Sequence, residues 1–278
     1  MNTIDTASIR ALAIDLDGTV LRPDATLSKR TRRALRNCLE RGVQVLICTG
    51  RAVDAAEQYR LAIGADGVMV YFNGAQVVDM PRRAVVRETL LERDAVEQCV
   101  DVARGMDVYF QAFFTGASHG VCLMTETLGA EAAMYSKHTG LRPVIGDLKS
   151  ALAVPETGCI KGMFVSEPER HAAIRAALGE QLSARLYIAQ TRRTFLEVMD
   201  ARVSKGAGLK LALEQRGLRR DHVIAFGDEE NDLPLFSEAA YSVAPANAKE
   251  AVRQAADVVV PSNADDGVAE FLENLFHR

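Results

Sequence analysis

The sequence lacks any apolar run of about 18 residues, the length at which a segment becomes a candidate for a membrane-spanning helix. It also lacks a large excess of charge of either sign, because the net charge is only −4. This balance gives no electrostatic reason to expect binding to nucleic acid or to an anionic membrane. The polar start of the chain, Met1–Asp5, has none of the basic and apolar regions of a signal peptide. We therefore expect neither a membrane nor a nucleic acid as a partner.

Cysteine is scarce, and its spacing carries no metal or disulfide motif. The five cysteines are scattered, and none belongs to a CxxC pair: Cys38, Cys48, Cys99, Cys122 and Cys159. An odd set without that spacing argues against a disulfide framework and against a cysteine-ligated metal. We expect all five to be reduced residues in the core of a cytoplasmic protein.

Apolar, strand-like runs alternate with amphipathic segments at both ends of the 278-residue chain, which is long enough for two domains. Near the N-terminus, strands are predicted at residues 9–14, 43–48 and 68–72, and helices over 29–41 and 52–63. The same alternation is predicted near the C-terminus, with a helix over 204–216 and strands at 223–226, 241–244 and 257–260. Continuous apolar strands alternating with helices predict a doubly wound α/β fold with a parallel sheet covered on both faces.

The middle of the chain has a different pattern. A helical stretch near residues 91–103 is followed by hairpin-like strands at 108–114 and 121–124. We expect an α+β domain inserted between the two halves of the first. The predicted domains are thus residues 1–82 with 200–278, and residues 83–199.

Polar side chains follow the predicted strands where each strand ends. Asp15 and Asp17 follow the first strand, Thr49 follows the second, and Asp228 follows Val223–Phe226. Alternate residues of a strand face the same way, so Asp15 and Asp17 are expected to point into one site. Ligands of such sheets bind beyond the carboxyl ends of the strands. Because carboxylate oxygens are the ligands that Mg²⁺ prefers, we expect a magnesium site at this edge.

These residue types suit phosphoryl transfer. Asp15 could attack phosphorus, while Asp17 protonates the leaving oxygen and later deprotonates the attacking water. Mg²⁺ held by Asp15, the Asp17 carbonyl and Asp228 would reduce the repulsion between the carboxylate and the phosphate. Lys205 stands in the first turn of a predicted helix, where the helix dipole disfavours a cation, which indicates a functional role. Its ammonium and the Thr49 hydroxyl could bind phosphoryl oxygens.

The chain resembles the haloacid dehalogenase (HAD) superfamily, and within it the Cof-type phosphatases with a C2B cap. Four motifs in order carry the resemblance: Asp15-Leu16-Asp17-Gly18-Thr19, Thr49-Gly50-Arg51, Lys205, and Gly227-Asp228-Glu229-Glu230-Asn231-Asp232. Phe72-Asn73-Gly74-Ala75 resembles the loop after the third strand, and Asp265-Asp266-Gly267-Val268 resembles the C-terminal signature. The chain departs from the pattern at Pro245-Ala246, where many relatives have Met-Gly, and this leaves Asn247 without an assigned role.

The resemblance implies a HAD-like core and an α+β cap that closes over the site and sets specificity. It makes Asp15 the nucleophile, Asp17 the acid/base, and Thr49 and Lys205 the groups that bind the phosphoryl group. It also implies Mg²⁺ ligands, substrate-binding residues and a supporting residue: Asp15, Asp17 and Asp228; Gly50, Arg51, Asn73, Gly74 and Asn231; and Asp232.

We predict a Mg²⁺-dependent phosphatase that acts on a small phosphorylated metabolite through an aspartyl-phosphate. A sugar phosphate is the first candidate substrate, and a nucleotide or cofactor-precursor phosphate is the second. Dehalogenation is disfavoured because Asp17 supplies an acid/base that ester hydrolysis needs. Two alternatives stay open: a phosphomutase, which would keep both aspartates, and a non-catalytic sensor of a phosphorylated metabolite on the same fold.

Overall fold

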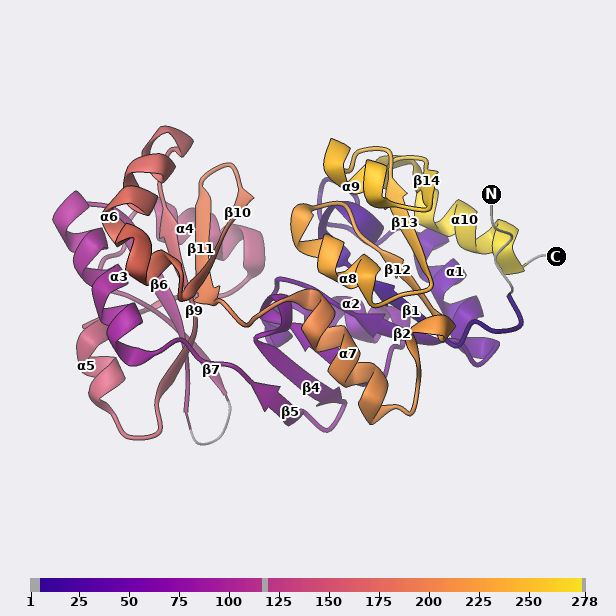
Figure 1. Ribbon diagram of the computed structural model, residues 1–278, viewed down its shortest axis with the longest axis horizontal. Helices are drawn as coiled ribbons and strands as arrows, with labels where there is room; N and C mark the ends of the chain where they lie inside the picture. Colours follow the sequence, from indigo (N-terminus) through magenta and orange to yellow (C-terminus); the bar gives the residue numbers. More distant parts are fainter. Residues whose placement is uncertain (1–5, 117–119, 277–278) are drawn as a thin grey trace. The chain divides into compact units, whose positions relative to one another are not determined.

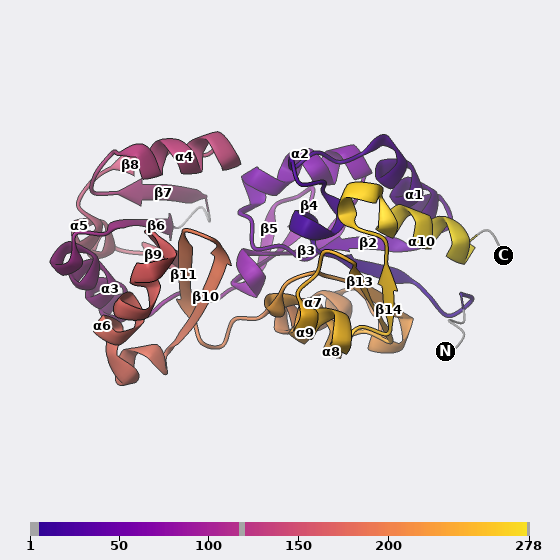
Figure 2. The same ribbon diagram turned by 90° about the horizontal axis from the view of Figure 1, so that it is seen from above.

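The computed structural model describes residues 6–116 and 120–276, so the polar start Met1–Asp5 lies outside the described residues. The chain divides into two compact units (Figures 1 and 2). The first unit consists of Met1–Arg87 and Ser204–Arg278, and the second unit is Glu88–Val203. Within the described ranges, no helix combines the length and the hydropathy that crossing a membrane requires.

The first unit is built on a five-stranded sheet with the order β14-β13-β12-β1-β2. Its strands are β1 (Ala11–Ile14), β2 (Gln44–Ile47), β12 (Val223–Phe226), β13 (Tyr241–Pro245) and β14 (Val258–Val260). Every neighbouring pair in this sheet is parallel. Of the three inner strands, β1 and β12 are buried along their whole length, as continuous apolar runs predict. The predicted α/β fold is therefore confirmed.

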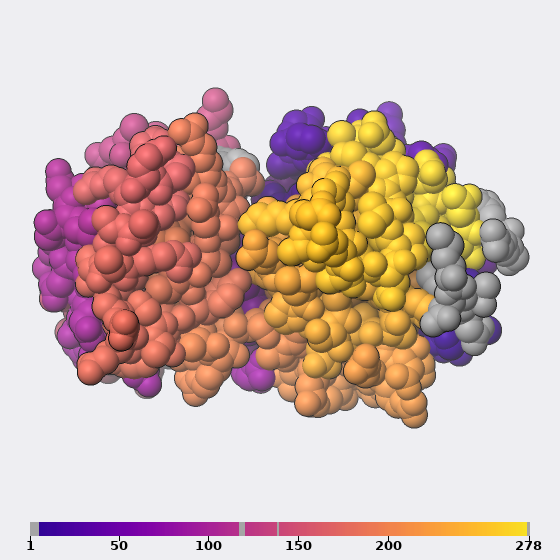
Figure 3. All heavy atoms as spheres, turned by 45° about the horizontal axis from the view of Figure 1, so that its top comes forward, coloured from indigo at the N-terminus to yellow at the C-terminus, as the bar shows by residue number. Residues whose placement is uncertain are grey.

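Helices lie on both faces of this sheet, with α1, α2 and α10 on one face and α7, α8 and α9 on the other (Figure 2). Their bounds are α1 (Lys29–Glu40), α2 (Val53–Ile63), α7 (Lys205–Gln215), α8 (Leu233–Ser237), α9 (Glu250–Ala255) and α10 (Gly267–Phe276). Ser28 caps α1 by accepting a hydrogen bond from the Thr31 N–H, and Gly64 ends α2 in the left-handed conformation. Figure 3 shows the C-terminal part of the chain (yellow) on the surface of the first unit.

The third predicted strand does not belong to the five-stranded parallel sheet. β3 (Gly67–Tyr71) forms a three-stranded sheet with β4 (Gln76–Met80) and β5 (Ala84–Glu88), and pairs antiparallel with β4. A single parallel bridge between Cys48 and Val70 joins it to the end of β2. The expectation that β3 continues the parallel sheet therefore holds only at that bridge, and the regular partner of β3 is β4.

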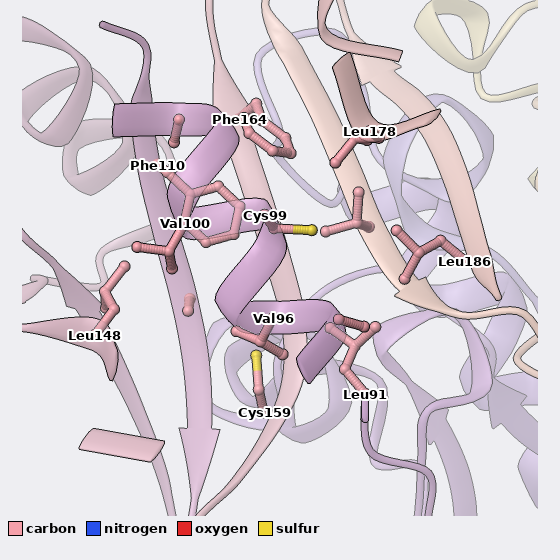
Figure 4. Packing of buried hydrophobic residues seen from close by; sticks show 14 of the residues in the cluster. Leu91, Val96, Cys99, Val100, Phe110, Leu148, Cys159, Phe164, Leu178 and Leu186 are labelled. Carbon is pink, nitrogen blue, oxygen red and sulfur yellow. The ribbon is translucent and has the colours of Figure 1, made fainter. Parts of the chain in front are cut away.

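The second unit has a six-stranded sheet with the order β10-β11-β9-β6-β7-β8. Its strands are β6 (Tyr109–Thr115), β7 (Val121–Thr125), β8 (Val144–Ile145), β9 (Gly158–Val165), β10 (Leu186–Arg192) and β11 (Phe195–Asp200). Its helices are α3 (Arg93–Met106), α4 (Ala130–Thr139), α5 (Leu148–Ala153) and α6 (His171–Ser183). Figure 4 shows Val100 of α3 beside Phe110 of the sheet, and Val96 of the same helix beside Cys159.

Four of the five cysteines are buried, and all five are free. The exception is Cys122 on β7, which is exposed, so the expectation that every cysteine lies in the core is wrong. Alternate residues of a strand face opposite sides, and the neighbouring Leu123 takes the buried side of β7.

The core of the second unit gives a test of packing. Phe164 is completely buried, with its ring centroid 4.7 Å from that of Phe110. Phe164→Ala should lower the free energy of unfolding by about 3–5 kcal/mol, because it removes a buried ring and leaves a cavity. Leu128→Ala is the control, since Leu128 is 60% exposed. Urea unfolding followed by circular dichroism measures both, and equal midpoints would contradict this account of the core.

Candidate active site

Asp15 follows β1 directly and is fixed by the sheet. Its backbone N–H donates to the Phe226 carbonyl of β12 at 3.0 Å. The side chain is almost fully buried, and its Oδ1 lies 2.7 Å from the Lys205 ammonium. The backbone of Asp15, the predicted nucleophile, is therefore hydrogen-bonded to β12, and its carboxylate is paired with Lys205 of α7.

Asp17 lies in a turn (Leu16–Val20) rather than on the strand, because β1 ends at Ile14. The strand-based reason for placing both aspartates on one face is thus wrong: alternation does not extend through this turn. The Asp17 carboxylate accepts two hydrogen bonds from Arg51, from Nε at 2.6 Å and from Nη2 at 2.7 Å. It is near enough to Asp15 to add to the negative potential there.

Arg51 is held on both sides of its guanidinium. Besides pairing with Asp17, it lies over the Tyr59 ring, 5.1 Å from the centroid. The Tyr59 hydroxyl in turn donates to the Ala25 carbonyl at 2.9 Å. Arg51, expected to bind the substrate, is thus engaged by Asp17 in this structure. Sequence reasoning missed Tyr59, which no motif marks.

The turn after β12 brings a second pair of carboxylates to the site. Asp228 accepts a hydrogen bond from the Thr19 hydroxyl at 2.8 Å, a contact that sequence reasoning missed although Thr19 belongs to the first motif. Asp232 accepts hydrogen bonds from the backbone N–H groups of Asp228 at 2.9 Å and Glu229 at 3.1 Å. Carboxylate oxygens of Asp15, Asp228 and Asp232 all lie within 4.8 Å of one another.

Lys205 begins α7 and is only 1% exposed. Ser204 caps the helix by accepting a hydrogen bond from the Ala207 N–H at 3.0 Å. The Lys205 ammonium lies 2.7 Å from both Asp15 Oδ1 and Asp232 Oδ1. A Cβ at Gly206 would overlap the Pro234 carbonyl, so glycine is needed for α7 to approach α8 this closely. The two carboxylates offset the unfavourable helix dipole.

Three buried carboxylates share this one ammonium, which leaves a surplus of negative charge. Burial, reinforced by Asp232, raises the pKa of Asp228 to about 7. Burial likewise raises the pKa of Asp15, and Lys205 only partly offsets this. For Lys205 burial alone would lower the pKa, but Asp15 and Asp232 outweigh it and raise the pKa, so the ammonium stays charged.

This donor set fits a divalent cation. Several carboxylate oxygens with excess negative charge are the chemistry that Mg²⁺ prefers. Asp232 belongs to the cluster, but Lys205 and two backbone N–H groups already occupy its oxygens. Asp15 and Asp228 are therefore the side chains best suited to hold the ion.

The remaining predicted residues gather around the ends of β2 and β3. Thr49 is buried, and its hydroxyl accepts a hydrogen bond from the Arg51 N–H at 3.1 Å. The Asn73 N–H donates to the Thr49 carbonyl at 3.0 Å, and Asn231 Nδ2 donates to Asn73 Oδ1 at 3.0 Å. A Cβ at Gly50 would crowd the Asn73 side chain.

Two of these side chains have atoms to offer a ligand. Asn73 Nδ2 and Asn231 Oδ1 are buried and make no hydrogen bond among the described residues. Gly74 has φ +102°, and a Cβ there would overlap the Ser204 carbonyl, so glycine lets this loop meet the start of α7. The structure thus brings the second, third and fourth motifs into one neighbourhood with the first.

Comparison with known proteins gives consistent matches along the chain. The family described as haloacid dehalogenase-like hydrolase matches residues 12–272. The chain is similar to the 5-amino-6-(5-phospho-D-ribitylamino)uracil phosphatase YitU of Bacillus subtilis, with 30% identity over 270 residues, 95% of this chain and 97% of that protein. It is 29% identical over 265 residues to a phosphoglycolate phosphatase of Methanopyrus kandleri, covering 95% and 96% of the two chains.

A solved structure supports the fold. The chain superposes on a haloacid dehalogenase-like hydrolase from Bacteroides thetaiotaomicron with a TM-score of 0.86 and 24% identity, covering 96% of this chain and 100% of the other. At this identity the likeness concerns the fold alone.

The raised pKa of Asp228 gives the metal-free protein a testable pH dependence. Between the unfolded pKa of about 4 and the folded value of about 7, the folded state binds the extra proton, so the free energy of unfolding falls as pH rises. Asp228→Asn removes the buried negative charge at this position and its repulsion by Asp232. In EDTA, the variant should therefore gain Tm relative to wild type between about pH 5.5 and about pH 8.

The matched control is Asp265→Asn, because Asp265 is exposed. Its Tm difference from wild type should not change over the same pH range. A Tm difference for Asp228→Asn that also stays constant with pH would contradict the assigned electrostatics.

Proposed function

The chain belongs to the haloacid dehalogenase-like hydrolase family and is a phosphatase, and from this premise we propose that it hydrolyses a small phosphorylated metabolite with the aid of Mg²⁺ and through an aspartyl-phosphate on Asp15. Family membership confirms the resemblance to the haloacid dehalogenase superfamily that the motifs indicated. The observation that carries the proposal is the buried Asp15 carboxylate, held by the Lys205 ammonium beside Asp228.

In the proposed mechanism, an Asp15 oxygen attacks phosphorus and the bond from phosphorus to the ester oxygen breaks. Asp17 gives its proton to the departing alkoxide. A water molecule then attacks the phosphorus of the aspartyl-phosphate and returns a proton to Asp17, which releases inorganic phosphate and regenerates Asp15. Mg²⁺, when bound by Asp15 and Asp228, would neutralise charge on the phosphoryl oxygens.

Lys205 and the amide side chains have binding roles in this proposal. The Lys205 ammonium holds Asp15 in place and can donate a further hydrogen bond to a phosphoryl oxygen. Asn73 Nδ2 is a buried donor that finds no partner in residues 6–116 and 120–276, so a phosphoryl oxygen could satisfy it. Thr49 lies in the same neighbourhood, and its hydroxyl could also donate to a phosphoryl oxygen.

The pair between Asp17 and Arg51 must separate during the reaction. A carboxylate that accepts two hydrogen bonds from a guanidinium has no proton to donate, so the acid role of Asp17 requires release from Arg51. Release also frees Arg51 to contact the substrate, the role expected for it. The paired arrangement is therefore a resting state in this proposal.

We assign the binding of the leaving group, and with it specificity, to the second unit, which has its own sheet and core. A small substrate is supported by the substrates for which the two relatives are named, a phosphoribitylamino-uracil and phosphoglycolate. A sugar or sugar-alcohol phosphate is the first candidate, and a cofactor-precursor phosphate is the second.

The nucleophile can be tested by one substitution. Asp15→Asn should lower Mg²⁺-dependent hydrolysis of p-nitrophenyl phosphate by about a thousandfold or more, because the amide cannot form the acyl-phosphate. EDTA should abolish turnover by the unmodified protein. Asp24→Asn is the control, since Asp24 is exposed and its carboxylate accepts hydrogen bonds from the N–H and the hydroxyl of Thr26. Activity retained in Asp15→Asn would overturn the assignment.

The substrate class is tested by a panel of phosphorylated metabolites assayed for phosphate release. Sugar and sugar-alcohol phosphates should give the highest kcat/KM. A clear preference for nucleotides would contradict the first candidate while leaving the phosphatase mechanism intact.

A further inference from the structure

Asn247 lies in the loop between β13 and α9, and this loop touches both turns that carry the catalytic carboxylates. Asn247 Nδ2 donates to the Gly18 carbonyl at 2.8 Å. Two residues further on, the Lys249 N–H donates to the Asp228 carbonyl at 3.0 Å. One short loop therefore links the turn of Asp17 with the turn of Asp228.

The Asn247 amide is fixed from its other side. Its Oδ1 accepts hydrogen bonds from the Asn263 N–H at 2.9 Å and from the Ser262 hydroxyl at 3.2 Å. Because the oxygen already has two donors, the Nδ2 end must face Gly18. Asn263 also donates from its own Nδ2 to the Leu21 carbonyl at 2.7 Å.

The same C-terminal segment holds the chain just beyond the turn. Asp266 accepts hydrogen bonds from Arg22 Nε at 3.2 Å and Nη2 at 2.8 Å. The segment around residues 262–266 thus supports both Asn247 and the residues that follow the turn. This gives the C-terminal motif a physical connection to the site.

We propose that Asn247 is a positioning residue, whose amide anchors the turn Leu16–Val20 at the Gly18 carbonyl and so orients Asp17 as the acid/base. The inference rests on the function proposed above. It assigns a role to Asn247 although the chain departs from the family's sequence pattern at Pro245-Ala246.

The turn is closed by the Leu21 N–H, which donates to the Leu16 carbonyl, and is held at Thr19 by Asp228, so Asn247 is the contact that fixes it at the Gly18 carbonyl. Gly18 has φ +78°, and a Cβ there would overlap the Asp228 carboxylate, so no side chain stiffens this position. Asp15 is fixed by the sheet on one side of Asp17, and the contact with Asn247 fixes Gly18 on the other. Since Asp17 must leave Arg51 to donate a proton, its own side chain cannot hold the turn during that step.

The test measures how strongly kcat/KM depends on the leaving group. In a series of substituted phenyl phosphates, p-nitrophenolate departs readily without a proton, whereas phenolate depends more on the acid. Asn247→Ala should lower kcat/KM about tenfold for phenyl phosphate and only about twofold for p-nitrophenyl phosphate. The slope of log kcat/KM against leaving-group pKa should therefore become steeper than in wild type.

Two further variants make the test decisive. Asn247→Asp keeps the acceptor for Asn263 but replaces the donor to Gly18 by a charged carboxylate oxygen that repels the Gly18 carbonyl, so it should steepen the slope without a change in volume, even where the alanine variant fails to fold. Asn37→Ala, an exposed change on α1, should leave the slope unchanged. Equal losses for both substrates, or no loss, would overturn the positioning role.

The outcomes for the two proposals are separable. Absence of Mg²⁺-dependent hydrolysis by the wild type, or turnover by Asp15→Asn, would reject the proposed function. An active wild type combined with an unchanged slope in both Asn247 variants would reject the positioning role alone.

Discussion

The ammonium of Lys205, held 2.7 Å from both Asp15 and Asp232, is the contact on which the rest of the site depends. All three side chains are buried, and removing one partner of such a group leaves an uncompensated charge that costs about 3–5 kcal/mol. The same contact fixes the carboxylate of Asp15, the proposed nucleophile. Stability and chemistry therefore depend on one arrangement, and the surplus negative charge around it provides the attraction for a cation.

The sheet explains why distant segments meet at this lysine. β1 and β12 are neighbours in register, with Ile14 opposite Phe226, so the residues that follow each strand emerge side by side. Parallel strands place all their carboxyl ends at one edge, where ligands bind. The hairpin of β3 and β4 adds Asn73 to this edge through the single bridge at Cys48, and glycines at 74 and 206 allow the close approach of α7.

The strands, the helices and the polar residues at the strand ends could be predicted because apolar periodicity and capping residues act locally. Ser28 and Gly64 bound their helices as turn chemistry predicts. The orientation of Asp17 could not be predicted, since it depends on a turn and on Arg51, 34 residues away in sequence. The exposure of Cys122 and the departure of β3 likewise follow from strand pairing, which one sequence does not reveal. Asn247 had no readable role because its three partners lie in other segments.

The lysine stands at the point where the chain returns from the second unit, which ends at Val203. Ser204 there packs against the backbone of Gly74 and caps α7, so the first residue after the boundary is already fastened to the first unit. The start of α7, and with it Lys205, is therefore positioned by contacts that lie entirely within the first unit.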